Sequence, residues 1–339
     1  MSPAQLRIEA TRGELVESVH PVIVAVVDPN DRLLASAGDP AYLTWWRSAA
    51  KPFQALPLVE DGAADAFALT DEELALVCAS HSSEPRHLDL VERLMAKVGV
   101  EERMLACGVH TPLSPAVARA VARGAVNLTP RSSNCSGKHT GMLAVARHHG
   151  WPLEGYNVAG HPVQERILDE IARWTGETRD RILLAVDGCT AVCFGLPLRR
   201  MALAYARLGA SVESAPRRIV AAMMAHPYTV AGSGRLCTEL MAAWPGKIVA
   251  KIGADGIYSA TLPTLGWGIA LKVEDGDMRS SGLALVDVLR QLLERLAPGE
   301  ASGFPAAALS SHARQPIRNT RDAVTGEVRP AGVLRFSDV

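Results

Sequence analysis

Reactive side chains are concentrated in the stretch Ser132–Gly141, which holds hydroxyls, an amide, a thiol, an amine and an imidazole within ten positions. Two glycines flank its Lys138-His139 pair, and residues 142–147 continue with helical periodicity. The pattern predicts a tight turn that leads polar groups into the start of a helix, where backbone N–H groups attract anions. A capped helix N-terminus without further function is the alternative, because Ser and Asn are good N-caps in any protein.

A phosphate-binding loop is excluded at this stretch. Gly137-Lys138 resembles the end of the motif G-x-x-x-x-G-K-[ST]. However, position 132 is Ser where the motif requires Gly, and His139 stands where the magnesium-binding hydroxyl belongs. We therefore do not expect this stretch to bind the phosphates of a nucleotide.

A serine and a lysine form the tetrad Ser48-Ala49-Ala50-Lys51. On a helix, this spacing places the hydroxyl and the amine on one face. A lysine with a lowered pKa can take the proton from a nucleophilic serine. Ser and Lys are common, so a chance tetrad on a solvated helix face is the alternative. Apolar Phe53, Leu56 and Leu58 favour the functional interpretation, because they create an environment that desolvates the amine.

Three patterns occur in the order known from serine β-lactamases and penicillin-binding proteins, S-x-x-K, S-x-N and K-T-G. They are Ser48-x-x-Lys51, Ser132-x-Asn134 and Lys251-x-Gly253. Position 252 is Ile, where the third motif has a hydroxyl residue. No export signal accompanies the patterns, which argues against a cell-wall target.

Further polar groups follow apolar runs. Ser80 comes after the apolar end of a helix predicted from Asp71, and it either projects into a cleft or belongs to a Ser-rich loop. Asp187-Gly188-Cys189 follows a predicted buried strand over 182–186, in a place where ligand-binding loops are common. The next predicted helix after Ser80, over 85–98, is amphipathic with His87 on its polar face.

The elements that must position these groups are strands at both chain ends and helices between them. A β-branched run over 20–28 and a return over 33–36 predict a hairpin, and 247–258 with 266–273 predict adjacent antiparallel strands. A long helix over 280–296 closes the pattern. The fold class is thus α/β (α+β), with an antiparallel sheet built from both chain ends and packed with helices.

We expect one domain over residues 1–339. Its sheet region covers about 12–45 and 245–296, its helical and loop region covers about 46–244, and a loop-rich tail covers 297–339. A hydrophobic fraction of 48% and a charged fraction of 21% are typical of a globular protein. A net charge of −1 without a Lys/Arg-rich run argues against nucleic acid as the partner.

The sequence also predicts a cytoplasmic protein that does not enter a membrane. Its N-terminus lacks the apolar core of a secretory signal. No stretch approaches the roughly 18 apolar residues of a membrane span. In a reducing compartment, the six cysteines should be thiols or metal ligands rather than disulfides.

Over roughly Arg12 to Leu296, the chain resembles the L-asparaginases of the Rhizobium etli type, which are class 3 of the asparaginase II family. The motifs that carry the resemblance are Arg12-Gly13-x-x-Val16-Glu17-Ser18-x-His20, Arg47-Ser48-x-x-Lys51-Pro52-x-Gln54, Cys78-Ala79-Ser80-His81-Ser82, Asn134-Cys135-Ser136-Gly137-Lys138-His139, Asp187-Gly188-Cys189 and Lys251-x-Gly253-Ala254-Asp255-Gly256. The resemblance implies hydrolysis of L-asparagine to L-aspartate and ammonia, a fold like that of serine β-lactamases and glutaminases, and a homodimer.

The resemblance also assigns catalytic roles. It implies that Ser48 is the nucleophile with Lys51 as its partner, and that Ser80 forms a second pair with Lys251. Lys272 on the neighbouring strand is the alternative to Lys251. We expect substrate contacts from four further residues, the first two of which are candidates for binding the substrate carboxylate: Arg47, His139, Asn134 and Ala254.

A zinc site is implied by the same resemblance, through Cys135, Lys138 and Cys189, with Asp187 close by. Two thiolates suit Zn²⁺, and a fourth position can stay open for water. Lysine must lose its proton before it binds a metal, so affinity should weaken as pH falls. The alternative for the cysteines is a role as small buried apolar residues.

Two other functions compete with the asparaginase reading. One is a cytosolic serine acylase, amidase or β-lactamase-like hydrolase that uses the same Ser-Lys chemistry on another small amide. The other is a zinc-binding regulatory or structural protein in which the serines are only helix caps. Ammonia release from asparagine, nitrocefin turnover and metal content distinguish the three.

Overall fold

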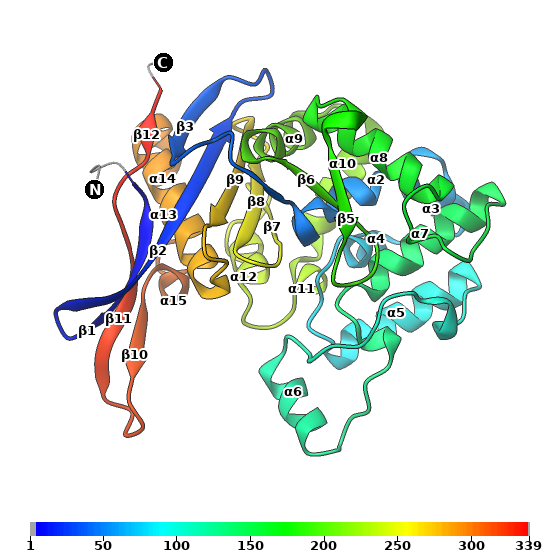
Figure 1. The fold of residues 1–339 in the computed structure, drawn as a ribbon, viewed down its shortest axis with the longest axis horizontal. Helices are drawn as coiled ribbons and strands as arrows, with labels where there is room; N and C mark the ends of the chain where they lie inside the picture. The colour runs from blue at the N-terminus through cyan, green and yellow to red at the C-terminus, as the bar shows by residue number, and fades with distance from the viewer. Residues whose placement is uncertain (1–4, 338–339) are drawn as a thin grey trace. The chain divides into compact units, whose positions relative to one another are not determined.

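The computed structural model describes residues 5–337 and divides into two compact units (Figure 1). Unit 1 comprises the chain up to Thr44, Pro197–Ala210 and the chain from Glu239 onward. Unit 2 comprises Trp45–Leu196 and Ser211–Thr238. Neither unit is one continuous segment.

Unit 1 is built on a nine-stranded sheet with the order β10-β11-β1-β2-β9-β8-β7, in which β3 also pairs with β2 and β12 pairs with β3. Its strands are β1 (Arg7–Arg12), β2 (Leu15–Val27), β3 (Leu33–Ala37), β7 (Val249–Ile252), β8 (Ile257–Leu262), β9 (Trp267–Val273), β10 (Gln315–Arg318), β11 (Val324–Ala331) and β12 (Arg335–Phe336). The antiparallel pairing of β2 with β9, such as Val24 with Leu271, joins the two chain ends. The predicted mixed fold with an antiparallel sheet from both ends is confirmed.

Helices cover both faces of this sheet at its centre, since all seven residues of β9 are buried and both α9 (Leu198–Ala210) and α13 (Met278–Leu296) contact it. The helix α9 lies so close to β9 that a Cβ at Gly268 would meet the Ala202 carbonyl oxygen at 2.0 Å. The predicted closing helix corresponds to α13. Two short helices follow it, α14 (Pro298–Ala301) and α15 (Ser310–Ala313).

Two sequence predictions about unit 1 are wrong. The tail is not only loops, because β10, β11 and β12 join the sheet; β11 pairs with β1, and its half-exposed residues lack the alternation that reveals a strand. The stretch 247–258 is not one strand but the hairpin β7–β8. Its turn holds Asp255 and Gly256 at φ of 55° and 73°, as an Asp-Gly turn between strands requires.

Unit 2 is mainly helical. Its elements are the 3₁₀ turns η1 (Arg47–Ala50), η2 (Glu102–Met104), η3 (Pro130–Ser132) and η4 (Arg179–Arg181), the helices α1 (Lys51–Gln54), α2 (Leu56–Glu60), α3 (Ala63–Ala66), α4 (Asp71–Val77), α5 (Pro85–Val98), α6 (Pro115–Ala122), α7 (Ser136–His149), α8 (Pro162–Thr175), α10 (Ser214–Ala225) and α11 (Pro227–Val230), and the strands β5 (Leu183–Val186) and β6 (Val192–Pro197). Three elements extend over a boundary between the units: β4 (Leu43–Trp45), α12 (Leu236–Ala243) and β6, whose last residue, Pro197, belongs to unit 1.

The buried helix α7 lies at the centre of unit 2, with every residue from Ser136 to Ala146 buried. Two glycines let it approach α4. A Cβ at Gly137 would lie 2.5 Å from the Leu76 carbonyl oxygen, and one at Gly141 would lie 2.7 Å from a methyl group of Val77. This packing brings the loop after α4 beside the start of α7.

Two local predictions about unit 2 are also wrong. The strand expected to be buried, β5, exposes all four of its residues, because it pairs with β6 on one side and forms an edge. His87 on α5 is buried rather than on a polar face, because its ring stacks between His81 and Tyr228.

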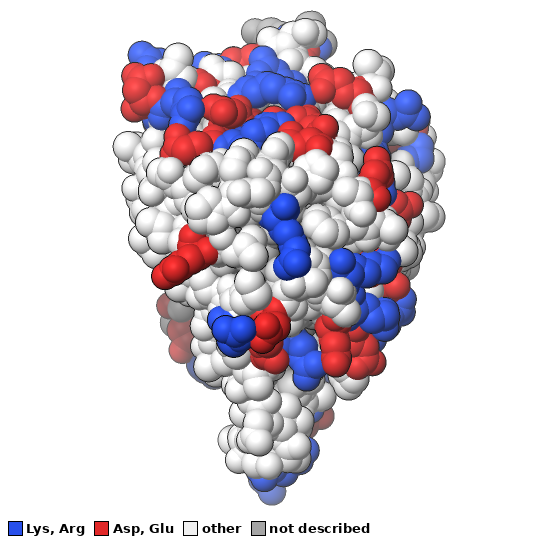
Figure 2. Space-filling view, turned by 90° about the vertical axis from the view of Figure 1, so that its right-hand side faces the viewer, with Lys and Arg blue, Asp and Glu red and all other residues white. Residues whose placement is uncertain are grey.

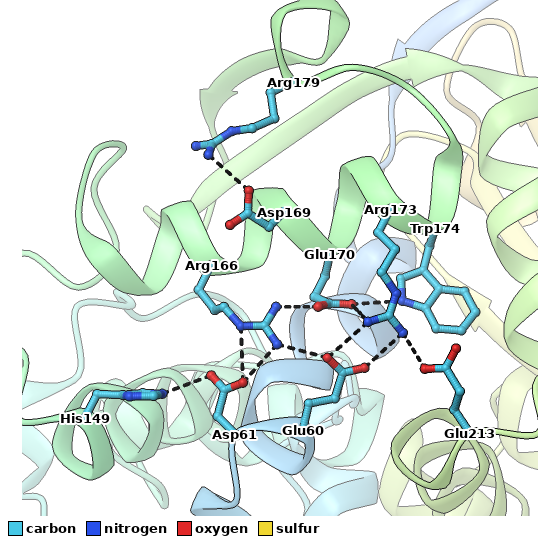
Figure 3. Close-up of polar contacts among 10 residues, drawn as sticks. All are labelled: Glu60, Asp61, His149, Arg166, Asp169, Glu170, Arg173, Trp174, Arg179 and Glu213. Carbon is cyan, nitrogen blue, oxygen red and sulfur yellow. Dashed lines mark hydrogen bonds and ion pairs between the residues drawn. The ribbon is translucent and has the colours of Figure 1, made fainter.

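Charged residues tie the outer helices of unit 2 together (Figure 3). The Arg166 guanidinium on α8 contacts Glu60 and Asp61 at 2.9 Å each, at the end of α2, and also contacts Glu170. Glu170 accepts a further hydrogen bond from the Trp174 indole at 2.9 Å. The network fixes α8 against α2.

One face of the molecule mixes both signs of charge. Figure 2 shows one face, on which basic and acidic side chains are interspersed rather than gathered into a continuous basic patch. Among residues 5–337, no helix combines the length and apolar composition that crossing a bilayer requires.

Candidate active site

Ten of the twelve predicted site residues belong to unit 2, and Lys251 and Ala254 belong to unit 1. Those in unit 2 come from four short segments: η1 with the start of α1, the loop after α4, the start of α7 and the loop after β5. They are Arg47, Ser48, Lys51, Ser80, Asn134, Cys135, Lys138, His139, Asp187 and Cys189.

Lys51 is fully buried, and its side chain joins three of these segments. Its Nζ donates to the Ala79 carbonyl at 2.5 Å, to the Ser80 hydroxyl at 3.1 Å and to the Asn134 carbonyl at 3.4 Å. All three acceptors are neutral oxygens. The amine is therefore held beside a serine hydroxyl in a desolvated place, as a lysine base requires.

Ser48 is half-buried on η1, where its backbone carbonyl accepts the Lys51 N–H. The S-x-x-K tetrad thus lies on a 3₁₀ turn, in which residues three apart lie above one another. Of the three hydrogen bonds that Lys51 Nζ donates, the one to a side chain goes to the Ser80 hydroxyl. The predicted pairing of Ser48 with Lys51 stays a prediction, as does that of Ser80 with Lys251.

A buried cluster of thiols and an amine lies at the start of α7. Lys138 Nζ donates to Cys189 Sγ at 3.0 Å. The Cys135 thiol donates to the Cys189 sulfur, which together with Lys138 lowers the pKa of Cys189 to about 4. The same contact and burial raise the pKa of Cys135 to about 12. Although burial disfavours the ammonium, the pKa of Lys138 is raised, mainly by the charge on Cys189.

Asp187 connects this cluster to Arg47, whose Nε donates to its carboxylate at 2.8 Å. Burial alone would raise the pKa of Asp187, but the charges of Lys138 and Arg47 hold it below its usual value. The cluster therefore carries no net charge, because two positive groups offset two negative ones. The positive groups are Lys138 and Arg47, and the negative groups are Asp187 and the Cys189 thiolate.

His139 offers an unused hydrogen-bond donor. Its Nδ1 accepts from the Tyr156 hydroxyl at 2.6 Å, and the Tyr156 oxygen accepts from the Ala106 N–H at 2.9 Å. Burial and the nearby Lys138 lower the pKa of His139 to about 3, so the ring is neutral with its hydrogen on Nε2. Among the residues that the structure describes, Nε2 has no hydrogen-bond partner.

Backbone strain occurs in the same segments. Arg47, Ser83 and Thr190 have φ of 51°, 60° and 74°, in the left-handed region that residues with a side chain rarely adopt. Strain of this kind persists where the surrounding structure enforces it, and it is common at functional sites.

Reactive residues gather around Lys51 and Lys138. The model of one protein family, described as L-asparaginase II, matches residues 8–330. The chain belongs to the L-asparaginase II family. Membership makes the protein a hydrolase, and it supports an amide as the substrate.

Among solved structures, the chain is similar to one described as a "putative beta-lactamase from Bacteroides dorei DSM 17855". The two share 16% sequence identity with a TM-score of 0.40, and the similarity covers 77% of this chain and 88% of that chain. No curated protein matches the chain.

Among the described residues of this L-asparaginase II family member, no three His, Cys, Asp or Glu side chains form a metal-binding group. The predicted metal residues are Cys135, Lys138, Cys189 and Asp187, and the Asp187 carboxylate is paired with Arg47. Two sulfurs and one nitrogen, with Cys189 in contact with both Cys135 and Lys138, do fit a zinc site with three protein ligands and an open position. Zinc therefore stays a prediction that the donor chemistry supports.

Several residues around the site were missed by sequence reasoning. His81 Nδ1 accepts the Ser83 N–H at 3.2 Å, so its Nε2 carries the hydrogen and donates to Ser136 Oγ at 2.9 Å. His81 is thus an anchor for α7 and not a base for Ser136. Arg235 donates to the Ser80 carbonyl at 2.6 Å. The Gly232-Ser233-Gly234 turn before Arg235 indicated an anion site in the sequence, but the contact with Ser80 could not be predicted.

Within unit 1, Lys251 is fully buried on β7, and its alternative Lys272 lies on β9. Lys272 Nζ donates to the carbonyls of Asp255 at 2.7 Å, Val273 and Glu274. Lys251 Nζ donates to the Ile252 carbonyl at 2.8 Å. The choice between Lys251 and Lys272 as the partner of Ser80 stays a prediction.

Proposed function

We propose that the protein is an L-asparagine amidohydrolase, which converts L-asparagine and water to L-aspartate and ammonia. The observation that carries the proposal is the buried contact of Lys51 with Ser80, next to the cluster of Cys135, Lys138 and Cys189. Membership of the L-asparaginase II family supports the amide substrate.

The reaction proceeds in two halves. Ser48 attacks the side-chain amide carbon of asparagine, and Lys51 takes the hydroxyl proton and returns it to the leaving nitrogen, which departs as ammonia. Water then attacks the resulting ester and gives its proton to Lys51, which releases aspartate and restores Ser48. Ser80, bonded to Lys51, keeps the amine in place during both proton transfers.

Substrate binding uses the polar groups around Lys51 and Lys138. The unused Nε2–H of His139 donates to a substrate oxygen, and the Arg47 guanidinium, which Asp187 holds in place, donates to the substrate carboxylate. The roles of Asn134 and Ala254 rest on the family motif alone.

Zinc is the proposed cofactor, bound by Cys135, Lys138 and Cys189, with Asp187 fixing Arg47 beside it. When bound, a zinc ion supplies a Lewis acid that polarises a carbonyl or lowers the pKa of water. Metal analysis tests the site. Cys135→Ser should lose most of the zinc that the wild-type protein retains, whereas Cys237→Ser, a buried cysteine of α12, should keep it. Equal zinc in the two variants would rule the site out.

A homodimer is proposed as the assembly, and the exposed edge strand β5 supports it. All four of its residues are apolar and exposed, and Val186 exposes 79% of its surface. Proteins usually protect such edges, and pairing with a second copy is one way to do so. Light scattering should find a dimer that Val186→Lys weakens and Val212→Lys, at an equally exposed turn, does not. Cytoplasmic localisation stays a prediction.

Ammonia release tests the function. Purified protein is assayed with L-asparagine and L-glutamine, with and without a chelator, and with nitrocefin in parallel. Ser48→Ala should abolish turnover, while Ser302→Ala, at an exposed position, should not change it. Turnover of nitrocefin or another amide without asparagine would favour the acylase or β-lactamase-like function. Zinc without any amidase activity would favour a structural or regulatory protein.

A further inference from the structure

A histidine outside the predicted site is linked to Lys51 by consecutive hydrogen bonds. His110 Nε2 accepts the backbone N–H of Asn134 at 2.9 Å. The carbonyl of the same residue, Asn134, accepts from Lys51 Nζ at 3.4 Å. Lys51 in turn contacts Ser80. The His110 imidazole therefore binds the backbone N–H of Asn134, and the backbone carbonyl of Asn134 binds the Lys51 amine.

The ring of His110 is itself fixed in one tautomer. Its Nδ1 donates to the Thr111 carbonyl at 2.7 Å, which leaves a lone pair on Nε2 for Asn134. Ser133 and Ser136 close the turn around Asn134 with a bond of 3.0 Å between their own backbone atoms. The N–H of Asn134 takes no part in that turn, so its partner is the histidine.

His110 belongs to an excursion of the chain, residues 108–128, that carries α6. No residue of α6 is buried, and this helix lies apart from the other helices of unit 2 in Figure 1. Val109 and Leu113, on either side of His110, expose 53% and 42% of their surface. Apolar packing therefore holds this segment weakly, and polar contacts at its base decide where it lies.

The base of the excursion is tied to the site on both sides. Before it, the Ala106 carbonyl accepts from Thr190 Oγ1 at 3.0 Å, in the loop that carries Cys189. After it, the Pro130 carbonyl accepts from the Cys107 thiol at 3.7 Å. His110 adds the contact that reaches Lys51 through Asn134.

We propose that His110 is a positioning residue, which sets the Asn134 backbone and thereby the place of Lys51, and which couples the excursion 108–128 to the catalytic amine. The inference rests on the proposed function, because Lys51 is the base only in that reaction. Without the acceptor on His110, Asn134 can rotate and the Lys51 amine loses a fixed contact. A displacement of about 1 Å at a reacting group costs roughly 100-fold in rate.

The test compares two replacements of His110. Leu has a similar size but no acceptor, and Gln offers a carbonyl oxygen that can accept the Asn134 N–H. We expect His110→Leu to lower kcat for asparagine by about 100-fold with little change in KM. His110→Gln should recover much of that loss. His148→Leu, at an exposed position of α7, is the matched control and should leave kcat unchanged.

Hydrogen exchange provides a measurement that does not depend on activity. The Asn134 amide should exchange faster in His110→Leu than in the wild type, while His110→Gln keeps its protection. Unchanged exchange in His110→Leu, or an unchanged kcat, would overturn the proposal. Equal losses of kcat in the Leu and Gln variants would overturn it too. A wild-type protein without asparaginase activity would instead refute the proposed function, and the exchange result would still decide whether His110 holds Asn134.

Discussion

Lys51 lies among oxygen atoms that carry no formal charge, whereas Lys138 lies among thiols and close to a carboxylate. The Lys51 amine is therefore suited to proton transfer, and the Lys138 amine is suited to metal binding. The Lys51 amine has neutral acceptors, so the proposed proton transfer breaks no ion pair there. A lysine that faces a thiolate is held in place by that charge until a metal ion replaces its proton.

Removal of the Lys51 amine should stop proton transfer. We expect Lys51→Met, which keeps the length of the side chain, to lower kcat for asparagine by about 10²- to 10⁴-fold. Lys247→Met, which removes a solvent-exposed pair with Glu300, should retain activity. Ammonia assays on both variants check this, and a Lys51→Met protein with wild-type turnover would show that another group is the base.

Thiol reactivity should differ sharply among the cysteines of the metal-free protein. The pKa of Cys189 is lowered to about 4, so its thiolate is present at pH 6 and is lost only as pH falls through about 4. Burial raises the pKa of Cys107 to about 12 and that of Cys193 to about 11, so both stay protonated thiols. Iodoacetamide at pH 6 should therefore label Cys189 first, as mass spectrometry of peptides can show. Labelling of Cys107 at the same rate would contradict this charge distribution.

Helix packing places the reactive residues. The loop after α4 lies beside the start of α7 because Gly137 and Gly141 allow close approach. A capping box, in which Thr70 Oγ1 accepts the Glu73 N–H at 3.3 Å, starts α4 and thus sets where Ser80 follows. On the outside of unit 2, the charged network of Figure 3 holds α2 and α8 together, whereas close contact at two glycines holds α4 and α7 together.

Loss of Arg166 should destabilise unit 2. Its guanidinium serves Glu60, Asp61 and Glu170, the last of which is nearly fully buried. Arg166→Met leaves Arg173 as the cation between Glu60 and Glu170 and removes the arginine from Asp61, and we expect a loss of about 2–3 kcal/mol in the free energy of unfolding. Arg179→Met, which breaks exposed pairs with Glu165 and Asp169, should cost less than about 1 kcal/mol. Denaturant titration of both variants measures the difference.

At the scale of the whole molecule, the chain passes between its units after Thr44, Leu196, Ala210 and Thr238. Each unit thus needs segments that are far apart in sequence. In unit 1 the central pair β2–β9 joins residues more than two hundred positions apart, and α9 reaches the sheet from the middle of the chain. Such long-range pairing makes partial folding unfavourable, because loop closure costs entropy before contacts form.

The single domain over 1–339 stays a prediction, and calorimetry tests it. If both units fold together, heating should give one transition whose van't Hoff enthalpy equals the calorimetric enthalpy. We expect that outcome because neither unit is a continuous piece of chain. Two separate transitions would show that the units unfold independently, and the prediction would then be wrong.

Sequence alone indicated the candidate reactive residues and most of the regular elements of this protein. The tetrad at Ser48, the thiols at Cys135 and Cys189, the hairpin of β2 and β3 and the closing helix α13 are all visible in local patterns. Periodicity reveals them because it reports which face of an element is buried. It failed for β11 and β5, since a half-exposed strand and an exposed apolar edge give the wrong pattern.

Only the tertiary structure decided which groups meet. Lys51 contacts Ser80 and Asn134, which lie 29 and 83 positions away, and Asn134 contacts His110. No local pattern holds that information, because these contacts depend on how α4 and α7 pack at two glycines. A hydrogen bond requires its atoms to lie within about 3.5 Å, and that precision comes from packing rather than from the order of residues along the chain.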